Sequence, residues 1–312
     1  MIVERGVVLG VPRSGTTFLM SALSRLPGAE CVTGNLLPVG IAHLAAQDLP
    51  EDMRGVLERS FRGALEDYLL SAVYLSRAAS MRKWWATGHP PGGLRRAAKG
   101  VRIESLLIYK EPFFAFVPEL PYQALPDSRL VYIFRDGRDV ADSLVRSYDV
   151  LTDEKLRGLE TNEAPIGRKV GDRFVPWWVA SAEEEAFLSA TPYIRAILMW
   201  RAMVRRCAAF LARPDVQESG RVLPVRYEVL MSDPLATGQA IVSHLGQELT
   251  ATTRRQLQTA HSRSIGIHRR RRSEEEILEA ERLAGPELEA LGYQLHARAE
   301  ASGVSPGAAA PL

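Results

Sequence analysis

The residues best suited to chemistry lie near the start of the chain, in a turn after a short apolar stretch. Residues 7–17 read Val-Val-Leu-Gly-Val-Pro-Arg-Ser-Gly-Thr-Thr, which keeps the glycine and threonine spacing of a nucleotide-binding P-loop. The lysine that would reach the phosphates of a nucleoside triphosphate is replaced by Thr16, and a cation stands earlier, at Arg13. Gly10 and Gly15 still allow a tight turn whose backbone N–H groups face an anion. The loop therefore predicts a site for a phosphate-like group other than that of ATP.

Further basic and aromatic residues directly follow apolar stretches that are typical of buried parallel strands. These stretches and the residues that follow them are 106–109 before Lys110, 130–134 before Arg135, and 222–225 before Arg226 and Tyr227. Ligands of parallel α/β sheets bind beyond the carboxyl ends of the strands. The cationic groups should therefore meet at one edge of the sheet, which favours a polyanionic ligand. Pro224 inside the last stretch predicts an edge or distorted strand.

Helical patterns alternate with these strands and define the fold class. Apolar residues at helical spacing predict helices over 16–26, 51–84, 138–147 and 192–211. Alternation of this kind predicts an α/β fold: a P-loop-containing three-layer sandwich with a central parallel sheet and helices on both faces.

The domain organisation follows from where composition changes. We expect a single domain over residues 1–300 and a disordered tail over 301–312, which is rich in Gly, Ala and Pro. The polar stretch 149–180 indicates a lid or acceptor-facing insertion, with surface disorder as the alternative. The four consecutive arginines from Arg269 to Arg272, followed by Glu274–Glu276, fit a solvated stretch that opens a helix.

Composition limits the function classes. The chain of 312 residues carries 39 basic and 37 acidic side chains, a formal charge of only +2, so its net charge gives no support for nucleic-acid or membrane binding. Cys31 and Cys207 match no disulfide framework or metal spacing, and no apolar run approaches the length of a membrane span. We expect a cytoplasmic protein without a structural metal.

Seven sequence blocks in a fixed order extend the first motif across most of the chain. They are Val11–Leu19, Tyr109–Phe113, Phe134–Ser143, Val225–Leu230 with Asp233 and Pro234, Ile241–Gly246, Ser264–Arg269 and Leu291–Tyr293. Together they resemble the sulfotransferases that use 3′-phosphoadenosine 5′-phosphosulfate (PAPS), most closely the bacterial enzymes and the tyrosylprotein sulfotransferases. PAPS carries a 5′-phosphosulfate and a 3′-phosphate, so the resemblance implies two anion sites.

The resemblance assigns the donor-binding residues. It implies that five consecutive loop residues cradle the 5′-phosphosulfate: Arg13, Ser14, Gly15, Thr16 and Thr17. It also implies that Arg135 and Ser143 hold the 3′-phosphate, that Tyr227 contacts the adenine, and that Arg269 adds a charge at the 3′-phosphate. An arginine fork suits a phosphate, and Ser143 follows Arg135 by about two helical turns.

Sulfuryl transfer needs in-line placement, charge stabilisation and removal of the acceptor proton. Lys110 matches a family lysine and is the expected charge on the bridging or sulfuryl oxygens, with Arg13 assisting and no metal required. The general base is open. The segment that matches the glutamate-bearing stretch of the tyrosylprotein enzymes, Cys31–Asn35, has no carboxylate, and the histidine position of the cytosolic enzymes holds proline. The candidates are Glu111, His43 and His89, or no base at all for an acidic phenol, and Glu111 is preferred.

The acceptor is expected to be a small-molecule alcohol or phenol, or an amine. Several aromatic side chains are candidates for an apolar acceptor pocket, with core packing as the alternative: Phe113, Phe114, Phe116, Trp84, Trp85, Trp177 and Trp178. Two rival functions are a P-loop kinase or NTPase and a non-catalytic nucleotide-binding regulatory module. The first is weakened by Thr16 in the lysine position, whereas the missing family glutamate favours the second.

Overall fold

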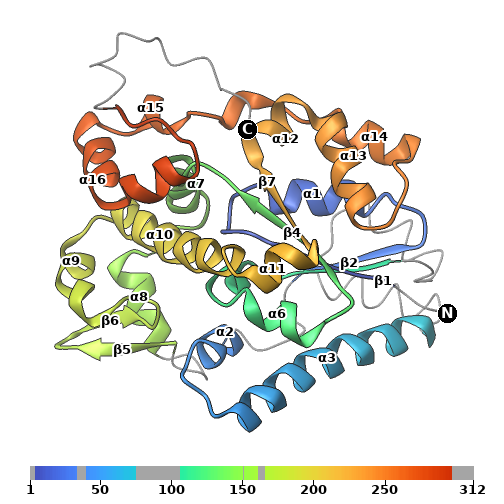
Figure 1. Cartoon of the computed structure of the whole chain (residues 1–312). Helices are drawn as coiled ribbons and strands as arrows, with labels where there is room; N and C mark the ends of the chain where they lie inside the picture. Colours follow the sequence, from blue (N-terminus) through green and yellow to red (C-terminus); the bar gives the residue numbers. More distant parts are fainter. Residues whose placement is uncertain (1–3, 34–39, 75–105, 150, 161–165, 297–312) are drawn as a thin grey trace.

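A parallel sheet of five strands, in the order β2-β3-β1-β4-β7, forms the centre of the molecule (Figure 1). The computed structural model describes residues 4–33, 40–74, 106–149, 151–160 and 166–296. The strands of the sheet are β1 (Glu4–Leu9), β2 (Ala29–Thr33), β3 (Leu106–Lys110), β4 (Arg129–Phe134) and β7 (Val222–Arg226).

Alternate side chains of each inner strand enter two separate cores, which explains why these strands are apolar on both faces. In β1, Val8 belongs to one core, whereas Val7 and Leu9 belong to the other. In β3 the same division separates Ile108 from Leu107. The two cores on either side of the sheet make the three-layer sandwich that the sequence predicts.

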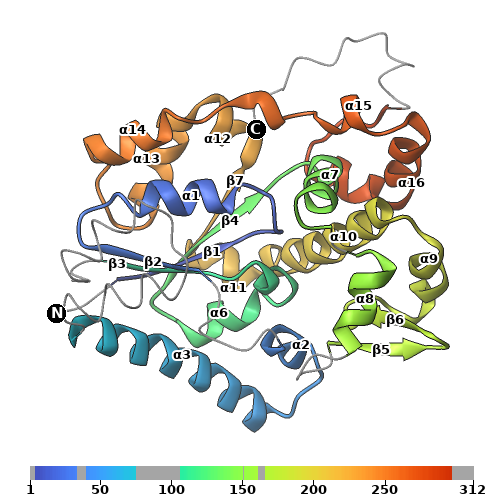
Figure 2. The ribbon, with the colours of Figure 1, turned by 180° about the vertical axis from the view of Figure 1, so that it is seen from behind.

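The core that contains Val8 and Ile108, here the first core, lies under helices that share one face of the sheet. These are α1 (Thr16–Leu23), α12 (Tyr227–Ser232), α13 (Pro234–His244) and α14 (Ala251–Leu257). From behind, α1 lies above the sheet and α3 below it (Figure 2).

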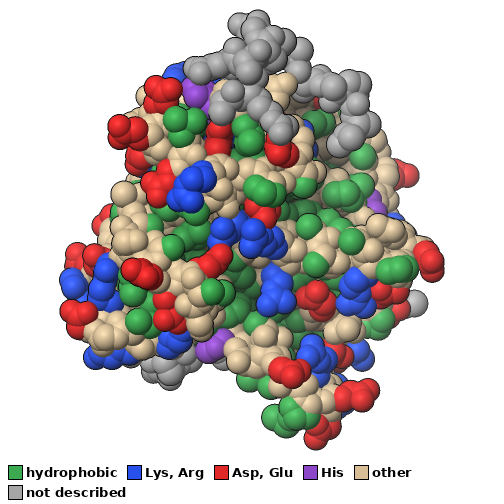
Figure 3. Space-filling view, turned by 60° about the vertical axis from the view of Figure 1, so that its left-hand side comes forward, with side chains coloured by type: hydrophobic (Ala, Val, Ile, Leu, Met, Phe, Trp, Pro, Cys, Tyr) green, Lys and Arg blue, Asp and Glu red, His purple; other side chains and the backbone are tan. Residues whose placement is uncertain are grey.

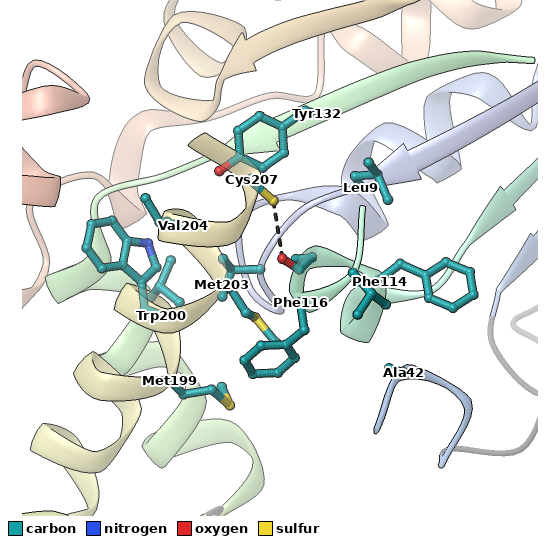
Figure 4. Close-up of a cluster of buried hydrophobic side chains, with 14 of the residues drawn as sticks. Leu9, Ala42, Phe114, Phe116, Tyr132, Met199, Trp200, Met203, Val204 and Cys207 are labelled. Carbon is teal, nitrogen blue, oxygen red and sulfur yellow. Dashed lines mark hydrogen bonds between the residues drawn. The ribbon is translucent and has the colours of Figure 1, made fainter. Parts of the chain in front are cut away.

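The second core lies on the opposite face. The elements that cover it are α3 (Glu51–Tyr74), a 3₁₀ helix η1 (Pro112–Phe116), α6 (Glu119–Ala124), α7 (Gly137–Tyr148), α10 (Pro192–Leu211), α11 (Pro214–Ser219) and α16 (Glu274–Ala290). Figure 4 shows Met203 and Cys207 of α10 close to Phe114 and Phe116 of η1. The Cys207 Sγ–H donates to the carbonyl of Ala115 at 3.3 Å, so this thiol is part of the core.

The edge strands depart most from the apolar pattern. Pro224 lies in β7, which among the described strands pairs with β4 alone, and this confirms the expected edge position. Strand β2 at the other edge was not predicted, because Glu30 and Thr33 interrupt its short apolar pattern. The predicted helices 138–147 and 192–211 correspond to α7 and α10, whereas α1 ends three residues before the predicted limit.

The described part of the 149–180 segment forms regular structure rather than surface disorder. It contains α8 (Asp153–Glu160) and an antiparallel hairpin of β5 (Gly167–Val170) and β6 (Arg173–Pro176). Phe174 and Val175 of the hairpin are buried. The hairpin lies beside α9 (Glu184–Ser189), at the end of the molecule where α10 meets α16 (Figure 1). The C-terminal part of the predicted helix 51–84 and the tail 301–312 lie outside the described residues.

Candidate functional site

The loop between β1 and α1 is folded so tightly that only glycine fits at two of its positions. A Cβ on Gly10 would stand 2.4 Å from the carbonyl oxygen of Ile133, and one on Gly15 would stand 2.4 Å from the ring of Tyr227. Gly15 has a φ of +91° and precedes α1, whose first turn has no side-chain cap. The first N–H groups of this helix have no side-chain cap among the described residues, and such groups can bind an anion.

Two hydroxyl groups of the loop support an anion site. Ser14 is fully buried, and its Oγ has no hydrogen-bond partner among the described residues. A buried hydroxyl without a partner is costly, and a ligand oxygen would satisfy it. Thr17 is exposed on the first turn of α1, where its Oγ1 accepts a hydrogen bond from Lys110 Nζ at 3.3 Å. These hydroxyl groups are compatible with an anionic ligand.

Lys110 ends β3 beside the loop, as the sequence predicts, because β3 pairs with β1 in parallel register. The side chain is only 6% exposed. Burial lowers the pKa of Lys110, the charge of Glu111 raises it, and the charge of Arg13 lowers it again. A partly desolvated ammonium at a strand end interacts strongly with a nearby anion, because little water screens its charge.

Arg135 directly follows β4 and links three parts of the site. Its Nη1 donates to the carbonyl of Arg13 at 3.1 Å, and its Nη2 donates to the carbonyl of Ser264 at 2.5 Å. The guanidinium lies over the ring of Tyr227, 4.5 Å from its centroid. Its Nε is buried without a partner among the described residues. These contacts hold the side chain in place, and its Nε–H remains for a further acceptor.

Arg13 and Ser143, expected at opposite ends of the donor, are in direct contact. Arg13 Nε donates to Ser143 Oγ at 2.9 Å, and its two terminal nitrogens donate to Tyr148 and Ser147 of α7 at 3.3 and 3.4 Å. Arg13 has a φ of +74°, a strained backbone conformation for a residue with a side chain. This guanidinium therefore lies against α7, between the P-loop and the residue expected at the 3′-phosphate.

Tyr227 begins α12 and is buried in the site. Its ring contacts the backbone of Gly15, as the glycine geometry requires, and its hydroxyl shares a 2.8 Å hydrogen bond with Ser264 Oγ. The ring face toward Arg135 is already covered by that guanidinium.

The arginine run separates into one free residue and three that have partners. Arg269 is exposed on α15 (His268–Arg271) and has no ion pair or side-chain hydrogen bond among the described residues. Arg271 and Arg272 instead pair with the buried Asp142, at 3.6 and 2.8 Å. Arg270 donates to a backbone carbonyl at 3.1 Å. The run is therefore more than a solvated stretch, although the acids after it do open α16 with a capping box at Ser273.

The general-base candidates lie in different surroundings. Glu111 Oε1 accepts the N–H of Phe113 at 3.2 Å and so caps η1, and burial raises the pKa of this carboxyl. His43 of α2 (Ile41–Ala45) stacks on Trp177 with ring centroids 5.2 Å apart, and burial lowers its pKa. His89 lies outside the described residues, as do Trp84 and Trp85.

The described aromatic candidates form a continuous cluster that starts near Lys110. Phe113 stacks on Phe116, which contacts both tryptophans after β6, with centroids 4.9 Å away for Trp177 and 5.9 Å for Trp178. Phe114 is fully buried and belongs to the core instead. In a space-filling view from the left-hand side of Figure 1, Lys and Arg side chains lie among hydrophobic ones near the centre of this face (Figure 3).

Several residues that complete the site were not predicted from the sequence. Asp139 lies four residues after Arg135, and their side chains are 3.6 Å apart. The i,i+4 spacing in a helix after a strand-end arginine was the available signal for this pair. Ser147 and Tyr148 gave no signal, because only the folded P-loop brings Arg13 to them.

The described residues contain neither a metal-binding cluster nor a membrane-spanning helix. Among them, no group of three or more His, Cys, Asp or Glu side chains is arranged to hold a metal ion. No helix in this part of the chain is long and apolar enough to cross a membrane.

Comparisons with known structures give distant similarities. The sulfotransferase domain of the olefin synthase of Synechococcus PCC 7002 is 18% identical, with a TM-score of 0.49 over 94% of this chain and 96% of that one. A sulfotransferase from Alicyclobacillus acidocaldarius is 20% identical, with a TM-score of 0.45 over 95% and 99% of the two chains. The mouse sulfotransferase SULT7A1, solved in complex with PAP, is 13% identical, with a TM-score of 0.42 over 93% and 89%.

Comparison of the sequence, rather than of the structure, identifies the family. A search among curated protein sequences gives no match. The sequence profile of the sulfotransferase family, however, matches residues 7–184, which is more than half of the chain and includes the P-loop, Lys110, Arg135 and Ser143. The chain therefore belongs to the sulfotransferase family.

Proposed function

We propose that the protein transfers a sulfuryl group from PAPS to a hydroxyl group of a small acceptor, an alcohol or a phenol, or to an amine. The observation that carries the proposal is the pair of cationic positions at the carboxyl edge of the sheet. Lys110 lies at the P-loop, and Arg135 lies in the same edge at the end of β4. Two anion sites on one edge match a donor that is anionic at both the 5′ and 3′ positions.

The 5′-phosphosulfate end is assigned to the P-loop. The groups available to bind it are the first-turn N–H groups of α1 and the hydroxyls of Ser14 and Thr17. Thr16 is buried beside them. Gly15 keeps the loop backbone close enough to the Tyr227 ring to shape this cradle. Thr17 already receives a hydrogen bond from Lys110, so the cation is within reach of the same anion.

The 3′-phosphate end is assigned to Arg135, Ser143 and Arg269. Arg135 keeps an unpartnered Nε, and Arg269 has no competing acid among the described residues. Arg13 bonds to Ser143 and so stands between the two ends, where it can serve either anion. Tyr227 closes this side of the site and is the family position for adenine contact.

The reaction requires few protein groups. The acceptor oxygen or nitrogen attacks sulfur in line, the sulfur–oxygen bond to the 5′-phosphate breaks, and 3′-phosphoadenosine 5′-phosphate (PAP) leaves. Lys110, with Arg13, stabilises the negative charge that develops on the bridging and sulfuryl oxygens. The acceptor proton passes to a base, for which Glu111 is assigned because it adjoins Lys110 in sequence and its raised pKa favours proton uptake.

The acceptor is assigned to the aromatic cluster. Phe113, Trp177 and Trp178 are only partly buried, and they extend from η1 to the end of β6. Flat apolar surfaces of this kind favour a hydrophobic or aromatic acceptor.

Product formation is the direct test of this function. Purified protein would be incubated with PAPS and a panel of alcohols, phenols and amines, without Mg²⁺, and the release of PAP would be followed by chromatography. We expect acceptor-dependent PAP release. Turnover of ATP with Mg²⁺ instead would favour the P-loop kinase or NTPase. Binding of PAP with neither hydrolysis nor transfer of PAPS would favour the regulatory module.

A further inference from the structure

A buried histidine outside the assigned donor contacts connects the C-terminal turn to the helix after β4. His268 is 1% exposed, and its Nδ1 is 2.6 Å from Asp139 Oδ1. An ionised carboxylate only accepts hydrogen bonds, so Nδ1 carries the proton and donates. The other ring nitrogen, Nε2, is buried and has no partner among the described residues.

Asp139 also binds the backbone of the same turn. Its Oδ2 accepts the N–H of Gly266 at 2.7 Å, and its Oδ1 accepts the N–H of His268 at 3.0 Å. Gly266 has a φ of +67°, which lets the turn present two N–H groups to one carboxylate. Asp139 Oδ2 is 3.6 Å from Arg135 Nη2, so a single carboxylate joins the turn to the strand-end arginine.

The turn held in this way supplies groups to the donor site. The carbonyl of Ser264 accepts from Arg135 Nη2, and the hydroxyl of Ser264 bonds to Tyr227. Arg269 follows His268 directly and is the free arginine of the run. The two arginines assigned to the 3′-phosphate, Arg135 and Arg269, therefore depend on where residues 264–268 lie.

We infer that His268 is a positioning residue for the 3′-phosphate site: through Asp139 it fixes the turn that orients Arg135 and delivers Arg269. This inference rests on the proposed function, because it assumes that these arginines bind the 3′-phosphate. The His268 side chain acts through one hydrogen bond, from Nδ1 to Asp139, since Nε2 contacts no described partner. The side-chain nitrogen of asparagine is two bonds from Cβ, as Nδ1 of histidine is. His268→Asn should therefore keep the hydrogen bond to Asp139.

Calorimetric titration with PAP and with adenosine 5′-phosphate, which lacks the 3′-phosphate, tests this role. The proteins are the wild type, His268→Leu, His268→Asn and the control His244→Leu. His244 is partly buried, and its Nε2 lies within hydrogen-bond distance of the backbone carbonyls of Leu130 and Arg221, away from the turn. We expect His268→Leu to bind PAP about tenfold more weakly with adenosine 5′-phosphate affinity changed less than about twofold, whereas His268→Asn and His244→Leu stay near wild type.

Three results of these titrations would overturn the positioning role of His268. Equal losses for both nucleotides, an unchanged PAP affinity in His268→Leu, or an Asn variant as weak as the Leu variant would overturn the positioning role. If His268→Leu does not fold, His268→Gln replaces it, because its amide lies one bond too far from Cβ and should show the same selective loss. A wild-type protein that does not bind PAP would overturn the proposed function itself.

Discussion

At the scale of single residues, Lys110 is the group on which turnover should depend most. We expect Lys110→Ala to lower kcat by about 10²-fold or more, because a buried charge next to the leaving phosphate acts mainly in the transition state. The KM for PAPS should change much less. The measurement is steady-state PAP release, with Lys155→Ala, an exposed lysine of α8, as the matched control.

The pH dependence of the wild type follows from the same lysine. Its pKa is lowered, mainly by burial, so the cation is lost at a lower pH than the ordinary value of 10.5. The rate should therefore fall on the alkaline side, below pH 10.5, because the neutral amine cannot stabilise the leaving oxygen. Unchanged turnover in Lys110→Ala would remove this residue from the mechanism.

One substitution, Glu111→Gln, separates the role of this residue as the cap of η1 from its proposed role as the general base. Glutamine keeps the oxygen that accepts the Phe113 N–H, so Glu111→Gln should preserve the cap of η1 and the thermal stability. It cannot take up a proton, and we expect kcat to fall by about 10²-fold. His43→Gln, measured in parallel, should keep most of the activity.

The acid side of the pH profile provides a second check on Glu111. Burial raises the pKa of this carboxyl above 4.5, so the base form is lost as the pH falls through a value higher than that of an exposed glutamate. The acid limb of kcat should lie above pH 4.5 in the wild type and disappear in Glu111→Gln. A fully active glutamine variant would leave the carboxylate with its capping role alone.

At the scale of elements, the turn from β1 to α1 is the part least tolerant of change. An alanine at Gly15 would have to adopt a φ of +91° and place its Cβ 2.4 Å from the Tyr227 ring. The strained backbone alone costs about 1–3 kcal/mol. We expect Gly15→Ala to lower the melting temperature and to weaken PAP binding, measured by thermal unfolding and calorimetry.

Gly63 of α3 provides the matched control. A Cβ at this position meets no atom within 4 Å, so Gly63→Ala should stabilise the helix by up to about 1 kcal/mol and leave PAP binding unchanged. Equal behaviour of the two alanine variants would contradict the proposed fit between the loop and Tyr227.

At the scale of the whole molecule, the sequence predicts the sheet better than the contacts inside the site. Four of the five sheet strands follow from apolar runs, because strands buried on both faces leave a continuous signal. Their carboxyl ends then bring Lys110 and Arg135 to one edge. Strand β2 was missed because an edge strand needs fewer apolar residues.

The remaining features of the site depend on tertiary geometry. The contact of Arg13 with Ser143 joins residues far apart in sequence, and no local pattern predicts the side-chain direction of Arg13 at a φ of +74°. The division of the arginine run likewise depends on where Asp142 lies after folding. Glu111 was predicted as the base, and its hydrogen bond with the N–H of Phe113 shows that it caps η1 without testing the predicted role as base.

The measurement that tests the central claim most directly is a calorimetric titration of the wild-type protein and Arg135→Ala with PAP in the absence of Mg²⁺. The account predicts saturable one-site binding to the wild type and affinity lower by about tenfold to a hundredfold in Arg135→Ala, because a buried charged hydrogen-bond donor to the 3′-phosphate is lost. If the wild-type protein does not bind PAP and binds only ATP with Mg²⁺, the proposed donor site is contradicted.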